Sequence, residues 1–194
     1  MAIKLVLASK NAHKAKEVQA IMGEEFEIIT QDKTVAADID VVEDGTTFEE
    51  NAIKKAVTIM EATGMLTVAD DSGLCVDALD GRPGVYTARF AGEHATDDEN
   101  ITKLLGALEG VAEEDRGAAF VSVIALASPT DGVKTFRGEC RGRILTEKHG
   151  ENGFGYDPVF YTDVYGKSMA EVSAEEKNSI SHRFNALKKL KENF

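Results

Sequence analysis

The stretch TVADDSGL, residues 67–74, organises the chain. It begins as a short apolar run with strand character and stops at two adjacent carboxylates, followed by Ser-Gly. Side chains alternate between the two faces of a strand, so Asp70 and Asp71 are expected to point to opposite sides. Because α/β sheets place their ligand crevices at the carboxyl ends of strands, we predict that one carboxylate faces a site and the other supports it. A strand that ends in an ordinary capped turn is the plainer alternative, since Asp, Ser and Gly are common turn residues.

The composition is that of an ordinary globular protein with an acidic balance. The chain has 194 residues, 43% of them hydrophobic, with 34 acidic against 22 basic residues and a net charge of −12. This balance argues against a nucleic acid or a membrane surface as the main partner, because both favour a basic face. No apolar run approaches the roughly 18–20 residues of a membrane span, and the N-terminus has no signal-sequence pattern. We therefore expect a cytoplasmic protein with Cys75 and Cys140 reduced.

Upstream of the central stretch, the chain begins with a strand–turn–helix pattern. Residues 3–8 form an apolar strand signal, and residues 15–22 have the pattern of a helix. The turn between them, SKNAHK at residues 9–14, holds two good helix-capping residues and two lysines. Backbone N–H groups left free at the helix start, the helix dipole and the lysines together predict an anion site. A capped strand–helix junction with solvated lysines is the alternative.

A second strand is expected at residues 26–30, and an acidic, irregular segment follows it. Thr47 and Glu50 form a capping box, which starts a helix that runs to about Thr63. Glu43 therefore lies just ahead of a helix start, where a loop residue can reach into a site. A solvated loop acid is the alternative for Glu43 in so acidic a chain.

Downstream, strands and helices continue to alternate around a hairpin. Two further capping boxes begin at Thr96 and Ser173, and Ser181 can cap the final helix. Strand patterns occupy residues 118–127, 133–140, 141–146 and 158–161, with a Pro-Thr-Asp-Gly turn between the first two. The alternation and the hairpin predict an α/β fold with a mixed sheet.

Residues 149–157, HGENGFGYD, form a glycine-rich loop that carries two aromatic residues. Phe154 and Tyr156 lie in a segment without apolar periodicity, which suits stacking on a planar ligand; a place in the core is the alternative for Phe154. The capping signals put Lys177 in a short helical turn and the pair His182 and Arg183 in the first turn of the final helix. A structural histidine and a solvated arginine are the alternatives for that pair.

Four motifs, in order along the chain, resemble the inosine triphosphate pyrophosphatase (Ham1-like) family, which acts on deaminated purine nucleoside triphosphates. They are SKNAHK at 9–14, DDSGL with GRPGVYTAR at 70–74 and 81–89, GFGYDP at 153–158, and Lys177 with SHR at 181–183. The resemblance runs from residue 3 to about residue 190 and implies a single domain over residues 1–194. Ser9 stands where the family often has threonine, and Thr87 where it often has serine; both keep a hydroxyl.

The resemblance implies an elongated α/β fold with two lobes around a long mixed β-sheet, a nucleotide cleft between the lobes and a homodimer. It implies Mg²⁺-dependent hydrolysis of ITP, dITP and XTP to the nucleoside monophosphate and pyrophosphate, which cleanses the nucleotide pool. The metal positions fall on Glu43 and Asp71, with Asp71 also the general base, and a lysine directed at the phosphates falls on Lys55. The substrate-contacting positions fall on Ser9, Lys10, Asn11, Ala12, His13, Lys14, Ser72, Phe154, Gly155, Tyr156, Asp157, Lys177, His182 and Arg183.

The chemistry of hydrolysis assigns expected roles to these residues. Asp71 is expected to orient or deprotonate the attacking water, while Lys14 and Lys177 hold phosphate oxygens. Hydrogen-bond donors from His182 and Arg183 are expected to favour hypoxanthine and xanthine, which carry an acceptor oxygen where adenine carries a donor amine.

The remaining residues of the central stretch have supporting roles in this hypothesis. Ser72 is expected to offer its hydroxyl to phosphate, and Gly73 to let the chain turn away. Asp70 is expected to anchor a lysine or an arginine, unless a kink in the strand brings it to the metal.

Two other functions are compatible with parts of the pattern. A Maf-type nucleotide pyrophosphatase has a similar architecture and another base preference. A nucleotide-binding module that does not hydrolyse its ligand is a hypothesis of a different class, but it has no need of Glu43, Asp71 and Lys14 together.

Overall fold

The structure, a computed structural model, describes residues 1–194 and contains one seven-stranded sheet in the order β2-β1-β3-β4-β5-β6-β7. β1 pairs in parallel with β2 and β3, whereas β6 is antiparallel to both β5 and β7, so the predicted mixed α/β sheet is confirmed. The strands are β1 (Ile3–Leu7), β2 (Phe26–Thr30), β3 (Thr67–Val76), β4 (Gly117–Ser128), β5 (Gly132–Ile144), β6 (Phe160–Thr162) and β7 (Lys167–Ser168). The helices are α1 (Ala12–Met22), α2 (Phe48–Thr63), α3 (Asp97–Ala107), α4 (Ala174–Ile180) and α5 (His182–Lys191).

The chain divides into two compact units. Unit 1 comprises Met1–Ser72, Ser122–Gly138 and Arg183–Phe194. Unit 2 comprises Gly73–Val121 and Glu139–His182. None of the helices has the length and apolar character that a membrane crossing requires.

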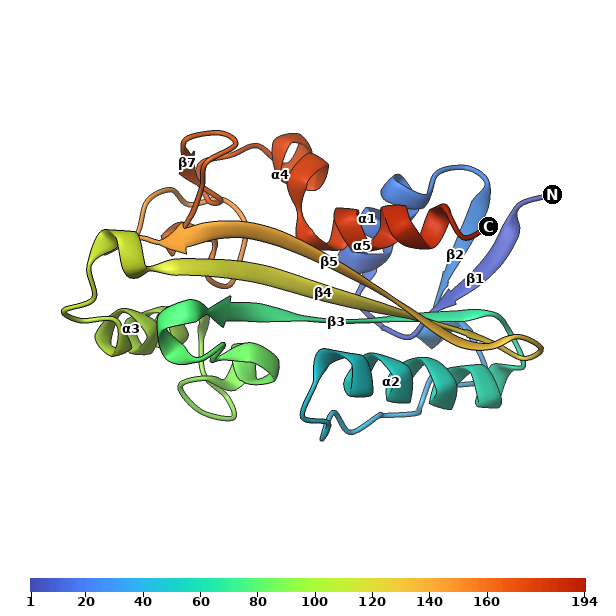
Figure 1. The fold of residues 1–194 in the computed structure, drawn as a ribbon. Coiled ribbons are helices and arrows are strands. Elements are labelled where there is room, and N and C mark those ends of the chain that lie inside the picture. The colour runs from blue at the N-terminus through green and yellow to red at the C-terminus, as the bar shows by residue number, and fades with distance from the viewer. The chain divides into compact units, whose positions relative to one another are not determined.

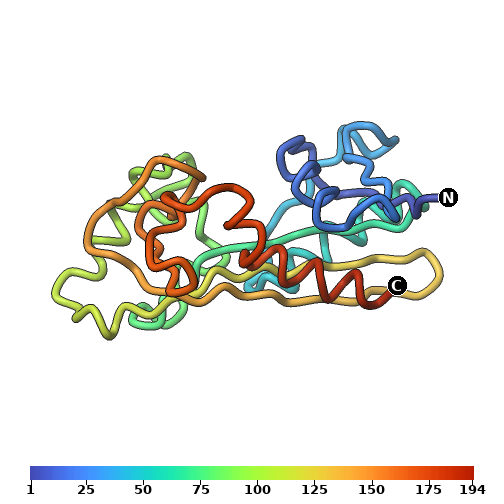
Figure 2. Tube along the Cα trace, turned by 90° about the horizontal axis from the view of Figure 1, so that it is seen from above, coloured from blue at the N-terminus to red at the C-terminus, as the bar shows by residue number.

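In unit 1, helices cover both faces of the sheet (Figure 1). Leu5 and Leu7 pack with residues of α1 and α5, whereas Val6, which points the other way, packs with Ile59 of α2. β1 is therefore apolar on both faces, as parallel strands between two helical layers are. The turn of the β4–β5 hairpin lies at the same end of unit 1 as both chain termini (Figure 2).

Unit 2 has its own core, which joins the outer part of the sheet to α3. Leu74 and Val76 of β3 pack with Leu104 of α3 and with the aromatic ring of Phe160. Gly142 of β5 has no room for a side chain, because a Cβ there would lie 2.6 Å from the Phe160 ring. The sheet is therefore closely packed at the position where β5 meets β6.

The capping patterns predicted from the sequence are confirmed. The side chains of Thr47, Thr96 and Ser173 each accept a hydrogen bond from the backbone N–H of the glutamate three residues on. Each glutamate side chain in turn accepts a hydrogen bond from the backbone N–H of the capping residue. The first helix begins at Ala12, three residues earlier than predicted, because Asn11 is its cap. The second helix ends at Thr63, followed by Gly64 in the left-handed conformation, as its C-terminal signal predicts.

Three further predicted boundaries are wrong. β3 does not stop at the aspartates but runs through them to Val76, so Gly73 lies inside a strand and makes no turn. The two strands expected at 133–140 and 141–146 are one continuous strand, β5. Pro158 lies in a short 3₁₀ turn, so β6 begins only at Phe160, because proline fits the first turn of a helix better than a sheet.

The capping box of α2 provides a direct stability test. Thr47→Ala removes the side-chain acceptor of the Glu50 amide and should lower the free energy of unfolding by about 1 kcal/mol. Thr58→Ala in the middle of the same helix should leave stability within about 0.5 kcal/mol, because alanine favours a helix interior. Urea unfolding of the two variants separates the effects; equal losses would contradict the capping role.

Candidate functional site

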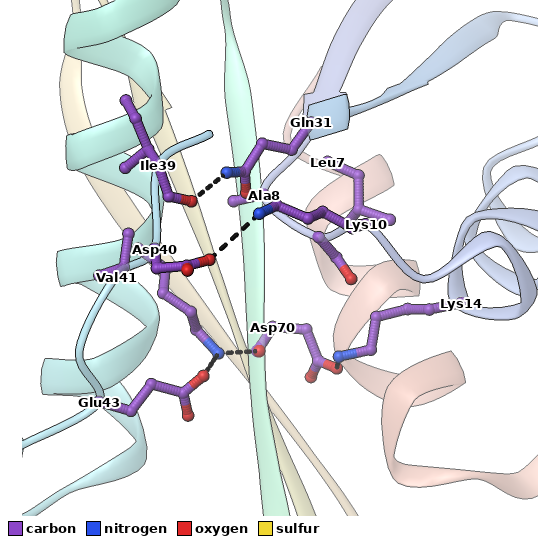
Figure 3. Close-up of a pocket in the computed structure, with 12 residues that line it drawn as sticks. Leu7, Ala8, Lys10, Lys14, Gln31, Ile39, Asp40, Val41, Glu43 and Asp70 are labelled. Atoms are coloured by element: carbon purple, nitrogen blue, oxygen red, sulfur yellow. Dashed lines mark hydrogen bonds and ion pairs between the residues drawn. The ribbon is translucent and has the colours of Figure 1, made fainter. Parts of the chain in front are cut away.

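A pocket of about 270 Å³ opens in unit 1, beside the end of β1 and the turn that leads into α1 (Figure 3). The acidic loop between β2 and α2 forms its opposite wall, from which Glu43 and Asp40 point inward. Its polar lining includes Ser9, Lys10, Lys14, Glu43, Lys55 and Asp70. Five of the predicted phosphate and metal positions thus share one cavity, whereas Asp71 and Ser72 do not line it.

The turn at residues 9–14 is built as a capped helix start. The Asn11 carboxamide oxygen accepts hydrogen bonds from the amides of His13 (2.9 Å) and Lys14 (3.1 Å), and the Ser9 hydroxyl accepts one from Asn11. Two of the N–H groups that we expected to remain free for an anion are therefore occupied by the cap. The lysines and the positive end of the helix dipole still favour an anion at this place.

Asp70 is the most highly coordinated side chain of the site. One carboxylate oxygen accepts from Arg183 (Nε 3.1 Å, Nη2 3.0 Å) and lies 2.9 Å from the Lys14 ammonium. The other accepts from the hydroxyls of Ser72 (2.5 Å) and Ser122 (2.8 Å). Although burial alone would raise it, Arg183 and Lys14 hold the pKa of this carboxyl well below its usual range. The interpretation of Asp70 as an anchor for an arginine and a lysine is confirmed.

Arg183 connects Asp70 to α1. Its Nη1 donates to Glu17 at 2.8 Å while Nε and Nη2 donate to Asp70, and the residue is buried. The alternative of a solvated arginine is therefore wrong. The substrate contact expected for Arg183 stays a prediction, as does the phosphate contact of Ser72, whose hydroxyl donates to Asp70 in this structure.

Asp71 faces the opposite side of β3, towards α2, as alternation predicts. Its Oδ1 lies 3.9 Å from the Lys55 ammonium, whereas its Oδ2 is buried and has no hydrogen-bond partner. Burial raises the pKa of Asp71 to about 6, against the lowering effects of Lys55 and a hydrogen bond from Asn51. The strand therefore presents one carboxylate with all its partners in place and, next to it, one with a buried oxygen that has no hydrogen-bond partner.

Glu43 reaches the same neighbourhood from the acidic loop. Its carboxylate accepts a hydrogen bond of 2.9 Å from Lys55, which also donates to the backbone carbonyl of Asp70 at 2.8 Å. In Figure 3 the Glu43 carboxylate is directed towards the main chain at Asp70. Lys55 thus contacts Glu43 and approaches Asp71, the two residues predicted to bind metal.

Two residues that sequence reasoning missed support these carboxylates. Asn51 is buried in α2; its Oδ1 accepts from the Gly45 amide at 2.8 Å, and its side chain hydrogen-bonds Asp71. A side chain at Gly45 has no room, because a Cβ would lie 2.6 Å from that Oδ1. The other residue is Ser122, which is buried in β4 and donates a hydrogen bond to the Asp70 carboxylate at 2.8 Å. A polar residue within an apolar helical stripe was the available signal for Asn51, and an isolated serine in an apolar strand for Ser122.

The donor set of Glu43 and Asp71 fits a divalent cation that keeps most of its ligands from water or substrate. Both offer carboxylate oxygens, and the buried Oδ2 of Asp71 lacks any partner. No group of three or more His, Cys, Asp or Glu side chains gathers to form a complete cage. Hard cations that hydrate strongly are commonly held by one or two carboxylates in this manner.

A second cluster lies in unit 2, where the glycine-rich loop meets α4. Asp157 is buried, and its Oδ2 accepts from Lys177 (2.6 Å) and from the amide of Phe154 (3.1 Å). The Lys177 ammonium lies 4.5 Å from the centre of the Phe154 ring, which is 67% exposed. The core alternative for Phe154 is therefore wrong: the ring is presented to solvent beside a lysine.

Tyr156 and His182 have more enclosed surroundings in unit 2. Tyr156 is only 3% exposed, and its hydroxyl donates to the Thr87 carbonyl at 2.7 Å, so its ring is part of the core. The half-buried His182 ring stacks on Phe120, with ring centres 5.2 Å apart. Of the two loop aromatics, Phe154 is thus the one with a ring open to a ligand.

Known proteins resemble this chain in both sequence and structure. The sequence model of the Ham1 family matches residues 5–193. A protein of Desulforamulus reducens named dITP/XTP pyrophosphatase is 50% identical over 98% of this chain and 94% of its own length. The solved Ham1 protein of Staphylococcus aureus superposes with a TM-score of 0.91 at 44% identity, covering 98% of this chain and 97% of that one. The HAM1 protein of Coxiella burnetii also reaches 0.91, at 42% identity and 98% coverage of both chains.

The Asp70 anchor predicts a large loss of stability on neutralisation. Asp70→Asn leaves Lys14 without its buried counter-charge and Arg183 with Glu17 alone, and should cost about 3–5 kcal/mol in the free energy of unfolding. Asp40→Asn, which removes an exposed partner of Lys10, should have little effect. Chemical denaturation of both variants at neutral pH measures the difference.

The same anchor predicts an acid-sensitive term in stability. Because the pKa of Asp70 is lower in the folded chain, its contribution is complete above the unfolded value of about 3.9 and is lost as the pH falls below it. Asp70→Asn should therefore lose less stability than the wild type between pH 5 and the acid range, and parallel curves for the two proteins would contradict the anchor.

Two loop glycines provide a matched pair for the second cluster. Gly153 and Gly155 both have positive φ, so alanine strains each backbone by about 1 kcal/mol. Only at Gly153 would a Cβ also overlap the Asp157 carboxylate, whereas Gly155 has open space. Gly153→Ala should therefore lose about 1–3 kcal/mol more than Gly155→Ala in thermal unfolding, through the displaced Asp157–Lys177 pair. Equal losses would mean that this pair does not hold the loop.

Proposed function

This chain belongs to the Ham1 family, and on that premise we propose that it hydrolyses ITP, dITP and XTP to the nucleoside monophosphate and pyrophosphate, removing deaminated purines from the nucleotide pool. The observation that carries the proposal is the buried, unpartnered carboxylate oxygen of Asp71, whose carboxylate lies 3.9 Å from Lys55, a lysine of the pocket. A triphosphate and a water molecule are the reactants that such an arrangement suits.

Binding of a polyanion to an acidic protein needs local positive charge, and the pocket lysines are one source of it. A nucleoside triphosphate carries about four negative charges, and the chain itself has a net charge of −12. Lys10, Lys14 and Lys55 bring three positive charges to one cavity at the positive end of α1, where each is paired with a carboxylate of the same lining: Asp40, Asp70 and Glu43. The proposal therefore needs a bound metal, together with these lysines, to neutralise the phosphates. In this proposal they hold phosphate oxygens locally, and Lys177 of unit 2 binds a phosphate oxygen as well.

We propose that Glu43 and Asp71 hold Mg²⁺, which neutralises phosphate charge and aligns the reacting groups when it is bound. The Asp71 carboxylate then takes the proton of the attacking water. In the metal-free protein burial raises the pKa of Asp71 to about 6, so the carboxyl is mostly ionised at neutral pH and available as a proton acceptor. Water adds to phosphorus, the α–β phosphoanhydride bond breaks, and pyrophosphate leaves.

Residues of the glycine-rich loop and the start of α5 are proposed to hold the base. The exposed Phe154 ring stacks on the purine, while Gly155, Tyr156 and Asp157 shape the loop around it. Donors from His182 and Arg183 meet the acceptor oxygen of hypoxanthine or xanthine. Adenine presents an amine there, and two donors facing each other leave a polar group unpaired, which discriminates strongly.

The proposal includes the setting of the enzyme. It is a single domain over residues 1–194, acts in the cytoplasm and forms a homodimer. Relatives named dITP/XTP pyrophosphatase that span nearly the same length support the single domain.

The assay for this function measures both products and the role of Asp71. With ITP and Mg²⁺ the protein should release pyrophosphate and inosine monophosphate. Asp71→Asn keeps the shape but removes the charge and the proton acceptor, and should lower turnover by about 10²-fold or more. Asp44→Asn, on the exposed side of the same loop as Glu43, is the control and should retain activity.

Other outcomes would replace the proposal. Release of inorganic phosphate instead of pyrophosphate, or binding without hydrolysis, would indicate another class of nucleotide-binding protein. Pyrophosphate release with no preference for ITP and XTP over ATP would indicate another base specificity, such as that of a Maf-type enzyme. Near-normal turnover of folded Asp71→Asn would remove Asp71 as general base.

A further inference from the structure

Lys55 lies between the two carboxylates proposed to bind metal. Its ammonium is 2.9 Å from the Glu43 carboxylate and 3.9 Å from Oδ1 of Asp71. A third oxygen, the backbone carbonyl of Asp70, accepts from it at 2.8 Å. The ammonium therefore sits among three oxygens, in the kind of surroundings that a small cation takes.

The placement of this ammonium is built into the fold. The Lys55 side chain, which lines the pocket, is only 13% exposed, and it extends from α2 about two turns after the helix cap at Thr47. The adjacent Asn51, bonded to Gly45 and Asp71, holds the same end of α2 against the acidic loop. The fixed start of α2 thus positions Lys55 next to the two carboxylates.

We infer that Lys55 is an internal counter-cation, which keeps Glu43 and Asp71 together in the metal-free protein and competes with the metal for them. The inference rests on the proposed function for the identity of the metal site. An oxygen of Glu43 that accepts a hydrogen bond from an ammonium is less available to a second cation, and two cations in one small site repel each other. Metal binding is therefore an exchange, in which Glu43 leaves Lys55.

The backbone carbonyl of Asp70 lowers the free-energy cost of this exchange, because Lys55 keeps one hydrogen-bond acceptor when it loses Glu43. When Glu43 turns to a metal, the ammonium retains the carbonyl as an acceptor, and its flexible four-carbon stem allows it to move within the pocket. Because the Asp70 carbonyl belongs to β3, it stays in place when the acidic loop that carries Glu43 moves. Lys55 therefore remains in the pocket, with a positive charge available to an anionic substrate.

The neighbouring Lys54 forms a natural comparison. It also pairs with a carboxylate of the acidic loop, Asp44, at 2.6 Å, but both side chains are exposed and neither lines the pocket. Replacing Lys54 changes the charge of α2 by the same amount as replacing Lys55. It leaves the surroundings of Glu43 and Asp71 intact.

The experiment measures binding of Mn²⁺ alone, by electron paramagnetic resonance, to the nucleotide-free protein. Lys55→Met removes the ammonium and keeps the stem, and should bind Mn²⁺ about tenfold more tightly than the wild type. Lys55→Arg retains the charge and should stay within about twofold of the wild type, as should Lys54→Met. Glu43→Gln should lose most of the binding, which identifies the measured site.

Thermal unfolding supplies a second readout. Without metal, Lys55→Met should unfold at a lower temperature than the wild type, because the two carboxylates lose their counter-cation. Saturating Mn²⁺ should raise its unfolding temperature by more than it raises that of the wild type. If Lys55→Met does not fold, Lys55→Gln, which keeps a hydrogen-bond donor without the charge, takes its place in both measurements.

Unchanged or weaker Mn²⁺ binding by the folded, uncharged variants would overturn the inference, and so would a wild type that binds no Mn²⁺ at Glu43. The outcome is independent of the proposed function, because no nucleotide is present. A protein that binds Mn²⁺ as expected but releases no pyrophosphate from ITP would retain the inference and lose the function. Pyrophosphate release with unaltered Mn²⁺ affinity in Lys55→Met would do the reverse.

Discussion

The buried carboxylate of Asp70 constrains much of unit 1. Its two oxygens receive donors from α1, β3, β4 and α5, through Lys14, Ser72, Ser122 and Arg183. A buried charge is tolerated only where other groups replace its hydration. Moving any of these four elements would remove one of the groups that stabilise the Asp70 carboxylate. The lysine at the pocket and the arginine at the start of α5 are thereby positioned by the same group.

The adjacent residues Asp70 and Asp71 of β3 have different surroundings, which suit a structural role for the first and a chemical role for the second. Asp70, with all its partners, has a strongly lowered pKa, whereas Asp71 on the other face keeps an unpartnered oxygen and a raised pKa. The pleat of the strand puts neighbouring carboxylates into different surroundings, and different surroundings suit different tasks. Rigid support on one face of the strand therefore allows an incompletely satisfied group on the other.

Local patterns predicted the parts of the fold that depend on nearby residues. The capping box at Thr47 involves residues three apart, and the opposite directions of Asp70 and Asp71 follow from the strand alone. The end of β3 was misjudged because Asp-Ser-Gly has turn chemistry, which tertiary partners override here: Ser122 and Arg183 hold Asp70 from other elements while the strand continues to Val76. Asn51 and Ser122 were missed because a polar residue in an apolar helix or strand does not show which carboxylate it will meet: Ser122 reaches Asp70 across 52 positions.

The sequence by itself determined the α/β class, the capped starts of the helices after Thr47, Thr96 and Ser173, and the family resemblance, and it predicted a set of candidate site residues. These depend on periodicity, capping and motif spacing, which act over a few residues. Only the tertiary structure decided which charges meet. Arg183 reaches Asp70 across 113 positions, and Lys55 meets both Glu43 and the carbonyl of Asp70. Such contacts arise from the packing of α2 and α5 on opposite faces of unit 1, and packing is a property of the whole folded unit.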